Sequence, residues 1–247
     1  MTSESLSLVS LGSVRIGVLL SYLPIFTITR VPVLIRILLA VALSVALLHA
    51  TAGGQLTTLA DFVAALCREI FVGAVLVFGF MCGFGALLFG GRIADFQMGF
   101  GVAGLLDPAS GNQSPLLGTL LHMAGLLTFF AVDGHLLFLR GLAFSFSHVP
   151  VGAGLPMLSL DALIAQFGVM FFIGLAVVAP VVMSLLMVDL GMAIAGRTMP
   201  QVNMFIVGLP LKIFLGLFVL AISIPYLSPL LQRLYATIFE FWEYVMT

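Results

Sequence analysis

Long apolar runs alternate along the chain with short breaks rich in glycine, proline and polar residues. The runs predict helices over residues 8–27, 32–50, 59–89, 114–132, 135–146, 162–188, 203–224 and 230–247. The breaks between them are predicted at 30–32, 51–54, 90–92, 107–112, 133–134, 149–156 and 197–200. No linker is long enough to divide the chain, so residues 1–247 are predicted to form a single domain.

The run from Pro200 to Lys212 interrupts this apolar pattern late in the chain. It combines two prolines, a glutamine and an asparagine with the only lysine of the sequence. Polar groups and helix breakers at membrane depth need partners inside the protein. The run is therefore predicted to mark a contact or a bend rather than a wall that faces lipid.

Composition assigns the chain to the membrane proteins. It is 62% hydrophobic and 8% charged, with a mean hydropathy of +1.28, whereas a soluble domain carries about 25% charged residues. We therefore expect an all-α, polytopic, membrane-associated protein built from helical hairpins with broken helices. The net charge of −1 provides no basic face, so no nucleic-acid partner is expected.

Charged residues inside or beside the apolar runs are sparse. Each would cost at least ~2.5 kcal/mol if it faced lipid at a helix centre. Two explanations stay open: the charges line a cavity, or they are buried against partner subunits. These residues are Arg15, Arg36, Arg68, Glu69, Asp133, Arg140, Asp189 and Lys212.

Small and aromatic residues predict where helices pack. Gly79-x-x-x-Gly83 would let another element approach the 59–89 helix closely. The aromatic residues of 234–247, which include Trp242, suit an interfacial or subunit-packing helix better than a full span. The twelve methionines could fill a core or seal around a moving object.

Neither catalysis nor metal binding is indicated. Asp133-Gly134-His135 could belong to a metal site or a proton relay, but one His and one Asp do not complete a metal shell, and a turn beside a helix N-cap explains them. No nucleophile set, paired carboxylates or phosphate loop stands out. We therefore expect no enzyme activity, no metal and no cofactor.

A glycine-rich stretch follows residue 98. Gly99-x-Gly101-x-x-Gly104 matches the dinucleotide-binding pattern, but the strand that this motif requires is missing from the predicted elements. The glycines instead predict a flexible, close-packed segment before Asp107-Pro108. Such a segment is either a gate or an ordinary connecting loop.

Several short motifs occur in a fixed order along nearly the whole chain. They are Arg30-x-Pro32 with Arg36, Glu69-x-x-x-Gly73 with Gly79, Gly91-x-x-x-Asp95-x-Gln97-x-Gly99, Asp107-Pro108, Asp133-Gly134-His135, Pro180, and Pro200-Gln201-x-Asn203-x-Phe205-x-x-Gly208-x-Pro210-x-Lys212. This series resembles the FliR/SctT family, the integral export-gate subunits of bacterial type III secretion systems. The last motif is more similar to flagellar members than to virulence members.

The resemblance implies a flagellar biosynthesis protein, a subunit of the helical hetero-oligomeric export gate whose pore secretes unfolded flagellar proteins. Implied partners are FliP-like, FliQ-like, FlhB-like and FlhA-like subunits, the unfolded exported proteins in transit, and membrane lipid. The implied location is the bacterial inner membrane at the flagellar basal body, protruding to the periplasmic side. The alternatives are a virulence-type injectisome subunit (SctT-like) and, from another class, a small-solute transporter subunit.

The resemblance also implies roles for particular residues. A plug that closes the pore is expected over residues 97–115, although Val102 and Leu105 stand where the family often has bulkier side chains. The plug residues are Gln97, Met98, Gly99, Phe100, Val102, Leu105, Leu106, Asp107 and Pro108. The residues expected in subunit packing or structure are Glu69, Gly79, Gly83, Pro200, Gln201, Asn203, Phe205, Gly208, Pro210 and Lys212.

Overall fold

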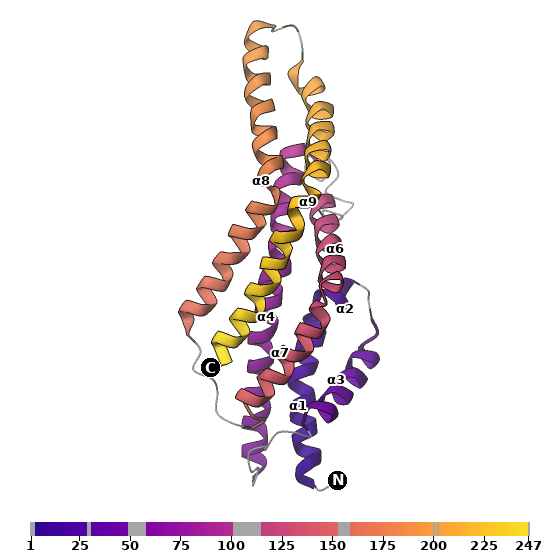
Figure 1. Ribbon diagram of the computed structural model, residues 1–247, viewed down its shortest axis with the longest axis vertical. Coiled ribbons are helices and arrows are strands. Elements are labelled where there is room, and N and C mark those ends of the chain that lie inside the picture. The colour runs from indigo at the N-terminus through magenta and orange to yellow at the C-terminus, as the bar shows by residue number, and fades with distance from the viewer. Residues whose placement is uncertain are drawn as a thin grey trace. The chain divides into compact units, whose positions relative to one another are not determined.

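The structure of the chain, a computed structural model, is helical throughout its regular elements (Figure 1). It describes residues 3–28, 31–48, 58–100, 115–152, 159–199, 201 and 203–246. The helices are α1 (Ser3–Tyr22), α2 (Pro24–Ile28), α3 (Val33–Leu48), α4 (Leu59–Met98), α6 (Leu116–Ala131), α7 (Gly134–His148), α8 (Leu160–Thr198) and α9 (Met204–Met246). The predicted all-α class is confirmed.

Among the described residues, three helices are long and apolar enough to cross a membrane, namely α4, α8 and Ile206–Met246 of α9, or up to four spans if α6 and α7 together form one. A 40-residue helix such as α4 is about 60 Å long, roughly twice the ~30 Å hydrocarbon core of a bilayer. Each of these helices is therefore longer than a single crossing needs.

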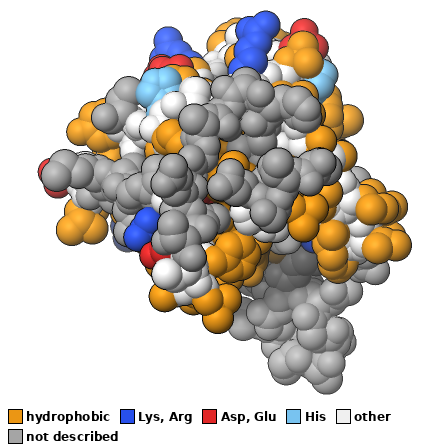
Figure 2. Space-filling model, turned by 90° about the horizontal axis from the view of Figure 1, so that it is seen from below, with side chains coloured by type: hydrophobic (Ala, Val, Ile, Leu, Met, Phe, Trp, Pro, Cys, Tyr) orange, Lys and Arg blue, Asp and Glu red, His pale blue; other side chains and the backbone are white. Residues whose placement is uncertain are grey.

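The three long helices differ in how far this chain covers them. In its most apolar stretch α4 is 67% buried, whereas α8 is 33% and α9 is 22% buried. Hydrophobic side chains accordingly reach the surface, as one face of the molecule illustrates (Figure 2). The chain thus buries α4 largely by itself and leaves apolar surface on α8 and α9.

The predicted break at Gly90-Gly91-Arg92 is wrong, because α4 runs without interruption to Met98. A Cβ at Gly90 would collide with the carbonyl oxygen of Gly174, and a Cβ at Gly91 would collide with the backbone of Gly118. These glycines therefore serve close helix packing rather than a turn.

The gap predicted between residues 224 and 230 is also wrong, because α9 is continuous through Pro225 and Pro229. A proline inside a helix costs about 3 kcal/mol. Burial of the residues that follow, such as Leu231 and Leu234, offsets this cost.

The helix α8 also continues past its predicted end at residue 188 and stops at Thr198. The first predicted helix instead divides into α1 and α2 before Pro24.

The chain forms two compact units, each assembled from segments that are distant in sequence. Unit 1 consists of Met1–Gly83, Phe130–Phe167 and Tyr235–Thr247, and unit 2 of Phe84–Phe129 and Gly168–Leu234. The helices α4, α8 and α9 each begin in one unit and end in the other. A single domain over residues 1–247 stays a prediction.

Trp242 lies at the centre of unit 1. Its side chain is 1% exposed, its indole N–H donates to the carbonyl oxygen of Leu76 at 3.0 Å, and its ring lies 5.4 Å from that of Phe80. Space for it comes from Gly141, where a Cβ would lie 2.7 Å from the indole ring. The interfacial or subunit-packing interpretation of this aromatic residue is therefore wrong, because its own chain buries it.

Gly79 lies close to side chains of α9, while a role of Gly79 and Gly83 in subunit packing stays a prediction. A Cβ at Gly79 would lie 2.9 Å from the ring of Phe241, so only glycine lets the C-terminal part of α9 approach α4 at this point. Gly83 is buried in the same helix. The small residues of α4 thus admit the large aromatic residues of α9.

Candidate functional site

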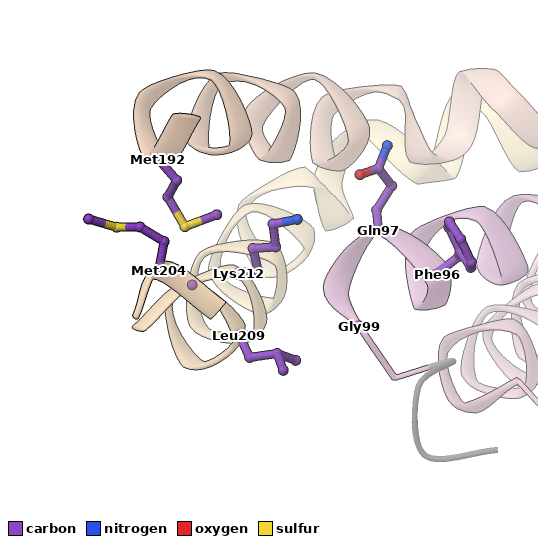
Figure 3. Close-up of a pocket in the computed structure, with 8 residues that line it drawn as sticks. Phe96, Gln97, Gly99, Met192, Met204, Leu209 and Lys212 are labelled. Carbon is purple, nitrogen blue, oxygen red and sulfur yellow. The ribbon is translucent and has the colours of Figure 1, made fainter. Parts of the chain in front are cut away.

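A pocket of about 190 Å³ in unit 2 joins the two stretches that the sequence singles out (Figure 3). It lies between the end of α4, the end of α8 and the beginning of α9. Its lining residues are Phe96, Gln97, Gly99, Met192, Met204, Gly208, Leu209 and Lys212. The start of the predicted plug and the run that ends at Lys212 therefore share one site, although about a hundred residues separate them in sequence.

The helix α4 ends in a Schellman motif beside this pocket. The Phe100 N–H donates to the Asp95 carbonyl at 3.0 Å, and the Gly99 N–H donates to the Phe96 carbonyl at 3.1 Å. Gly99 has φ of 88°, in the left-handed region that glycine adopts without strain. A Cβ at Gly99 would also lie 2.6 Å from Leu209 Cδ2. Gly99 thus sets the direction in which the chain leaves α4.

The buried carboxylate of Asp95 connects the two ends of the segment that follows. Asp95 is 5% exposed and accepts hydrogen bonds from the Leu117 N–H at 3.0 and 3.2 Å and from the Gly118 N–H at 3.4 Å. These amides belong to the first turn of α6, where a helix favours a negative charge. Asp95 therefore holds the end of α4 against the start of α6.

No role was predicted for Asp95 from the sequence. A carboxylate in the stretch after the 59–89 run, some twenty residues before a predicted helix start, was the signal that could have identified this cap. Without the fold, that signal could not be linked to α6.

Around the pocket, methionine side chains occupy space that is available because the facing residues are glycines. Met98 is fully buried, and a Cβ at Gly216 would collide with its side chain. A Cβ at Gly208 would lie 2.6 Å from Met192 Sδ. The methionines were predicted either to fill a core or to seal around a moving object, and Met98 fills the core.

Lys212 forms an ion pair with Asp189 of α8. The two side chains are 22% and 37% exposed, and pairs of this kind contribute about 0–1 kcal/mol. The contact predicted for the run that ends at Lys212 is thus present within the chain, at Gly208 as well as at Lys212. The sequence identified both charges but not their pairing.

Several predicted residues lie outside the described structure. They are Val102, Leu105, Leu106, Asp107, Pro108 and Pro200, and the side chain of Phe205. Gln201 and Asn203 are exposed just before α9, and the Asn203 carbonyl accepts the Ile206 N–H at 3.1 Å. Pro210 lies exposed in the second turn of α9.

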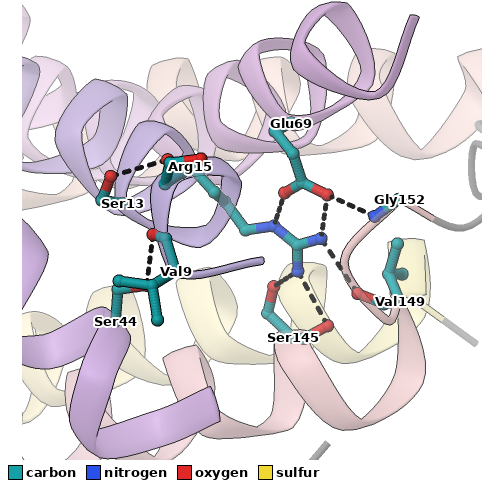
Figure 4. Close-up of polar contacts among 9 residues, drawn as sticks. Val9, Ser13, Arg15, Ser44, Glu69, Ser145, Val149 and Gly152 are labelled. Carbon is teal, nitrogen blue, oxygen red and sulfur yellow. Dashed lines mark hydrogen bonds and ion pairs between the residues drawn. The ribbon is translucent and has the colours of Figure 1, made fainter. Parts of the chain in front are cut away.

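A second polar site lies inside unit 1 (Figure 4). Arg15 is completely buried and forms a two-point ion pair with Glu69, from Nε to Oε2 at 2.6 Å and from Nη2 to Oε1 at 3.2 Å. Its remaining N–H groups donate to Ser145 Oγ at 2.9 Å, to the Ser145 carbonyl at 3.1 Å and to the Val149 carbonyl at 2.9 Å. All five N–H donors of the guanidinium are therefore used.

Other contacts complete this site. The Gly152 N–H donates to Glu69 Oε1 at 3.1 Å, and the Arg15 guanidinium lies 4.6 Å from the ring centre of Phe146. A Cβ at Gly73 would lie 2.9 Å from the Arg15 carbonyl oxygen, so α1 and α4 are in close contact.

From the sequence, these charges were expected to line a cavity or to be buried against a partner subunit. Both explanations are wrong for Arg15, because its charge is compensated by Glu69 inside the same chain. A subunit-packing role for Glu69 stays a prediction.

Asp133-Gly134-His135 forms the predicted turn. Asp133 occupies the N-cap position of α7 with φ of 56°, and its side chain makes no capping hydrogen bond. Its carbonyl instead accepts the Leu136 N–H at 2.9 Å. Within the described ranges, no group of three His, Cys, Asp or Glu residues could hold a metal ion.

Comparison with known proteins gives consistent matches. The family model described as bacterial export proteins, family 1, matches residues 6–238. The chain is 29% identical to the flagellar biosynthetic protein FliR of Escherichia coli, over 92% of this chain and 87% of that protein. It is 36% identical to FliR of Bacillus subtilis over 63% of this chain, a match that spans only 61% of that protein. It is also 30% identical to the Yop proteins translocation protein T of Yersinia pestis, over 59% of this chain and 57% of that protein.

Proposed function

The chain belongs to the bacterial export proteins, family 1, and on this premise we propose that it is a flagellar export-gate subunit. In this proposal it forms part of the pore through which unfolded flagellar proteins are secreted. The observation that carries the proposal is the family match over residues 6–238, supported by relatives named flagellar biosynthetic protein FliR. The long apolar helices agree with a location in a membrane.

The plug belongs to this proposal. Residues 97–115 would close the pore, with Val102, Leu105, Leu106, Asp107 and Pro108 in the closing part. The flanks of the segment support the assignment: Gly99 sets the exit from α4, and Asp95 ties that exit to the start of α6. A plug that moves needs firm attachment at both ends, and these contacts provide it.

The partners and the location are also proposals. We place the chain in the inner membrane at the flagellar basal body, protruding to the periplasmic side, beside FliP-like, FliQ-like, FlhB-like and FlhA-like subunits. The apolar surface left on α8 and α9 supports the presence of such neighbours. Gln201 and Asn203, exposed before α9, are proposed to bind a partner subunit.

The transporter alternative loses half of the observation that motivated it. It rested on charges in the apolar runs, and four of these form two ion pairs within the chain, Arg15 with Glu69 and Lys212 with Asp189. The injectisome alternative retains the similarity to the translocation protein of Yersinia pestis.

Deletion of the gene in its own host tests the proposed function. We expect loss of hook and filament export and of swimming, with both restored by the gene supplied on a plasmid. Normal flagellar export in the deletion strain would exclude a flagellar role. Loss of virulence-type secretion in the same strain would favour the injectisome alternative.

A further inference from the structure

A groove of about 140 Å³ runs between α1 and α3 in unit 1, and its α1 side is formed by residues of the helix that also carries Arg15. Arg36 Nη1 donates to the Ser21 carbonyl at 3.2 Å at one end of this helix pair, and Ser44 Oγ donates to the Val9 carbonyl at 2.9 Å at the other. The two helices are therefore antiparallel. Figure 4 includes the second of these contacts.

The walls of the groove suit hydrocarbon. Ser13 Oγ donates to the Ser10 carbonyl and Ser21 Oγ to the Gly17 carbonyl, so both hydroxyl donors are used within α1. Across the groove, Ile37 is 54% exposed although it is apolar. A Cβ at Gly17 would meet no atom within 4 Å, so the groove is open at this point.

Arg36 lines the groove with a charge that no described carboxylate neutralises. It donates to the carbonyl oxygens of Phe26 at 2.8 Å, Val31 at 3.1 Å and Ser21 at 3.2 Å, which are neutral groups. Arg15 and Lys212, by contrast, each have a carboxylate partner. The bonds to described residues use three of the five N–H donors of Arg36, which leaves one on each terminal nitrogen. A positively charged guanidinium with one remaining N–H on each terminal nitrogen is complementary to the oxygens of a phosphate group.

We infer that this groove binds an anionic phospholipid, with the phosphate on Arg36 and one acyl chain along Gly17 and Ile37. The volume is close to the ~150 Å³ apolar cavity that holds benzene, so it accommodates about six carbons of a chain. A helix of a partner subunit fits less well, because it would bury the Arg36 charge at a cost of desolvation unless it supplied a carboxylate. This inference is independent of the proposed export function.

Lipid retention by the purified full-length chain tests the inference. The chain in mild detergent is titrated with phosphatidylglycerol or phosphatidylcholine that carry the same acyl chains, and bound lipid is counted by native mass spectrometry. Gly17→Leu places a side chain in the groove at a position where a Cβ meets no atom within 4 Å. Gly191→Leu is the matched control, because a Cβ at Gly191 also meets no atom within 4 Å and the residue lies in unit 2.

The wild-type chain is expected to prefer phosphatidylglycerol about tenfold, because both lipids offer Arg36 the same phosphate but the choline cation of phosphatidylcholine cancels its charge. Gly17→Leu should lower phosphatidylglycerol retention about tenfold, because the added side chain occupies the space of the acyl chain, while Gly191→Leu retains it. Arg36→Gln should remove the preference for phosphatidylglycerol, and Arg36→Lys should keep part of it.

Three results would overturn the inference. They are equal retention of the two lipids by the wild-type chain, unchanged retention by Gly17→Leu, and a Gly17→Leu variant that changes the number of protein chains per particle but not the number of lipids. The last result would identify the groove as a protein interface. If Arg36→Gln loses its helical circular dichroism, the comparison of the two glycine variants decides alone.

Discussion

Replacing Glu69 by alanine should destabilise the protein severely, because it leaves the Arg15 charge buried without a counter-charge. Arg15 is 0% and Glu69 is 2% exposed, so water cannot take over the role of the lost carboxylate. Breaking a buried pair from one side costs about 3–5 kcal/mol. That loss lowers the ratio of folded to unfolded protein by about two to three and a half orders of magnitude. It is also a large share of the ~5–15 kcal/mol that stabilises a typical domain.

The measurement is the free energy of unfolding of the full-length chain in detergent, from a denaturant titration. Trp242 is the only tryptophan and is 1% exposed in the same unit, so its fluorescence reports the unfolding of the part that contains the pair. Asp189→Ala is the matched control. It removes the carboxylate of the partly exposed pair with Lys212 and should cost only about 0.2–1 kcal/mol.

A double variant separates the charge effect from packing. Arg15→Met with Glu69→Met removes both charges, so it should be less destabilised than Glu69→Ala alone. It should not equal the wild type, because the Gly152 N–H and the Val149 carbonyl lose their partners. The reasoning is refuted if Glu69→Ala costs no more than Asp189→Ala, or if the double variant is the least stable of the set.

Three further predictions concern the plug and the partner contacts. Gly99→Ala should cost about 1 kcal/mol or more from its positive φ alone, and more from the clash with Leu209, which a lower midpoint of thermal unfolding would report. Deleting residues 102–111 should make the assembled gate conduct ions, and a tight gate in liposome flux assays would refute the plug assignment. Replacing Gln201 and Asn203 by leucine should weaken assembly, at ~1–3 kcal/mol for each partner group left unsatisfied, and unchanged co-purification with sister subunits would count against it.

The glycines of α4 show why local patterns misplace structure. Gly90 and Gly91 look like a turn because glycine is a common helix terminator. In the folded chain they lie inside α4 and admit the backbones at Gly174 and Gly118. By contrast Gly99, in the same part of the sequence, does end the helix with a positive φ. The residue type is the same, and only the neighbouring helix distinguishes the two uses.

The predicted helices followed from the apolar runs because a long hydrophobic run without breakers has few alternatives to a membrane helix. The position of α7 after Asp133 was accessible for the same reason. The continuity of α9 through Pro225 and Pro229 could not be predicted from the sequence. A proline indicates a helix break from its local cost alone, whereas the burial that compensates for this cost depends on distant segments.

By itself the sequence determined the all-α membrane class, most helix starts and the family, since these depend on hydropathy and on the order of short motifs. The tertiary structure alone decided the partners of the charges. Arg15 and Glu69 are 54 residues apart, and whether a buried charge is compensated depends on which helices meet. It also decided that the start of the proposed plug segment and the Lys212 region line one pocket. Contacts of this kind arise only when distant segments pack together, and no local pattern of residues encodes them.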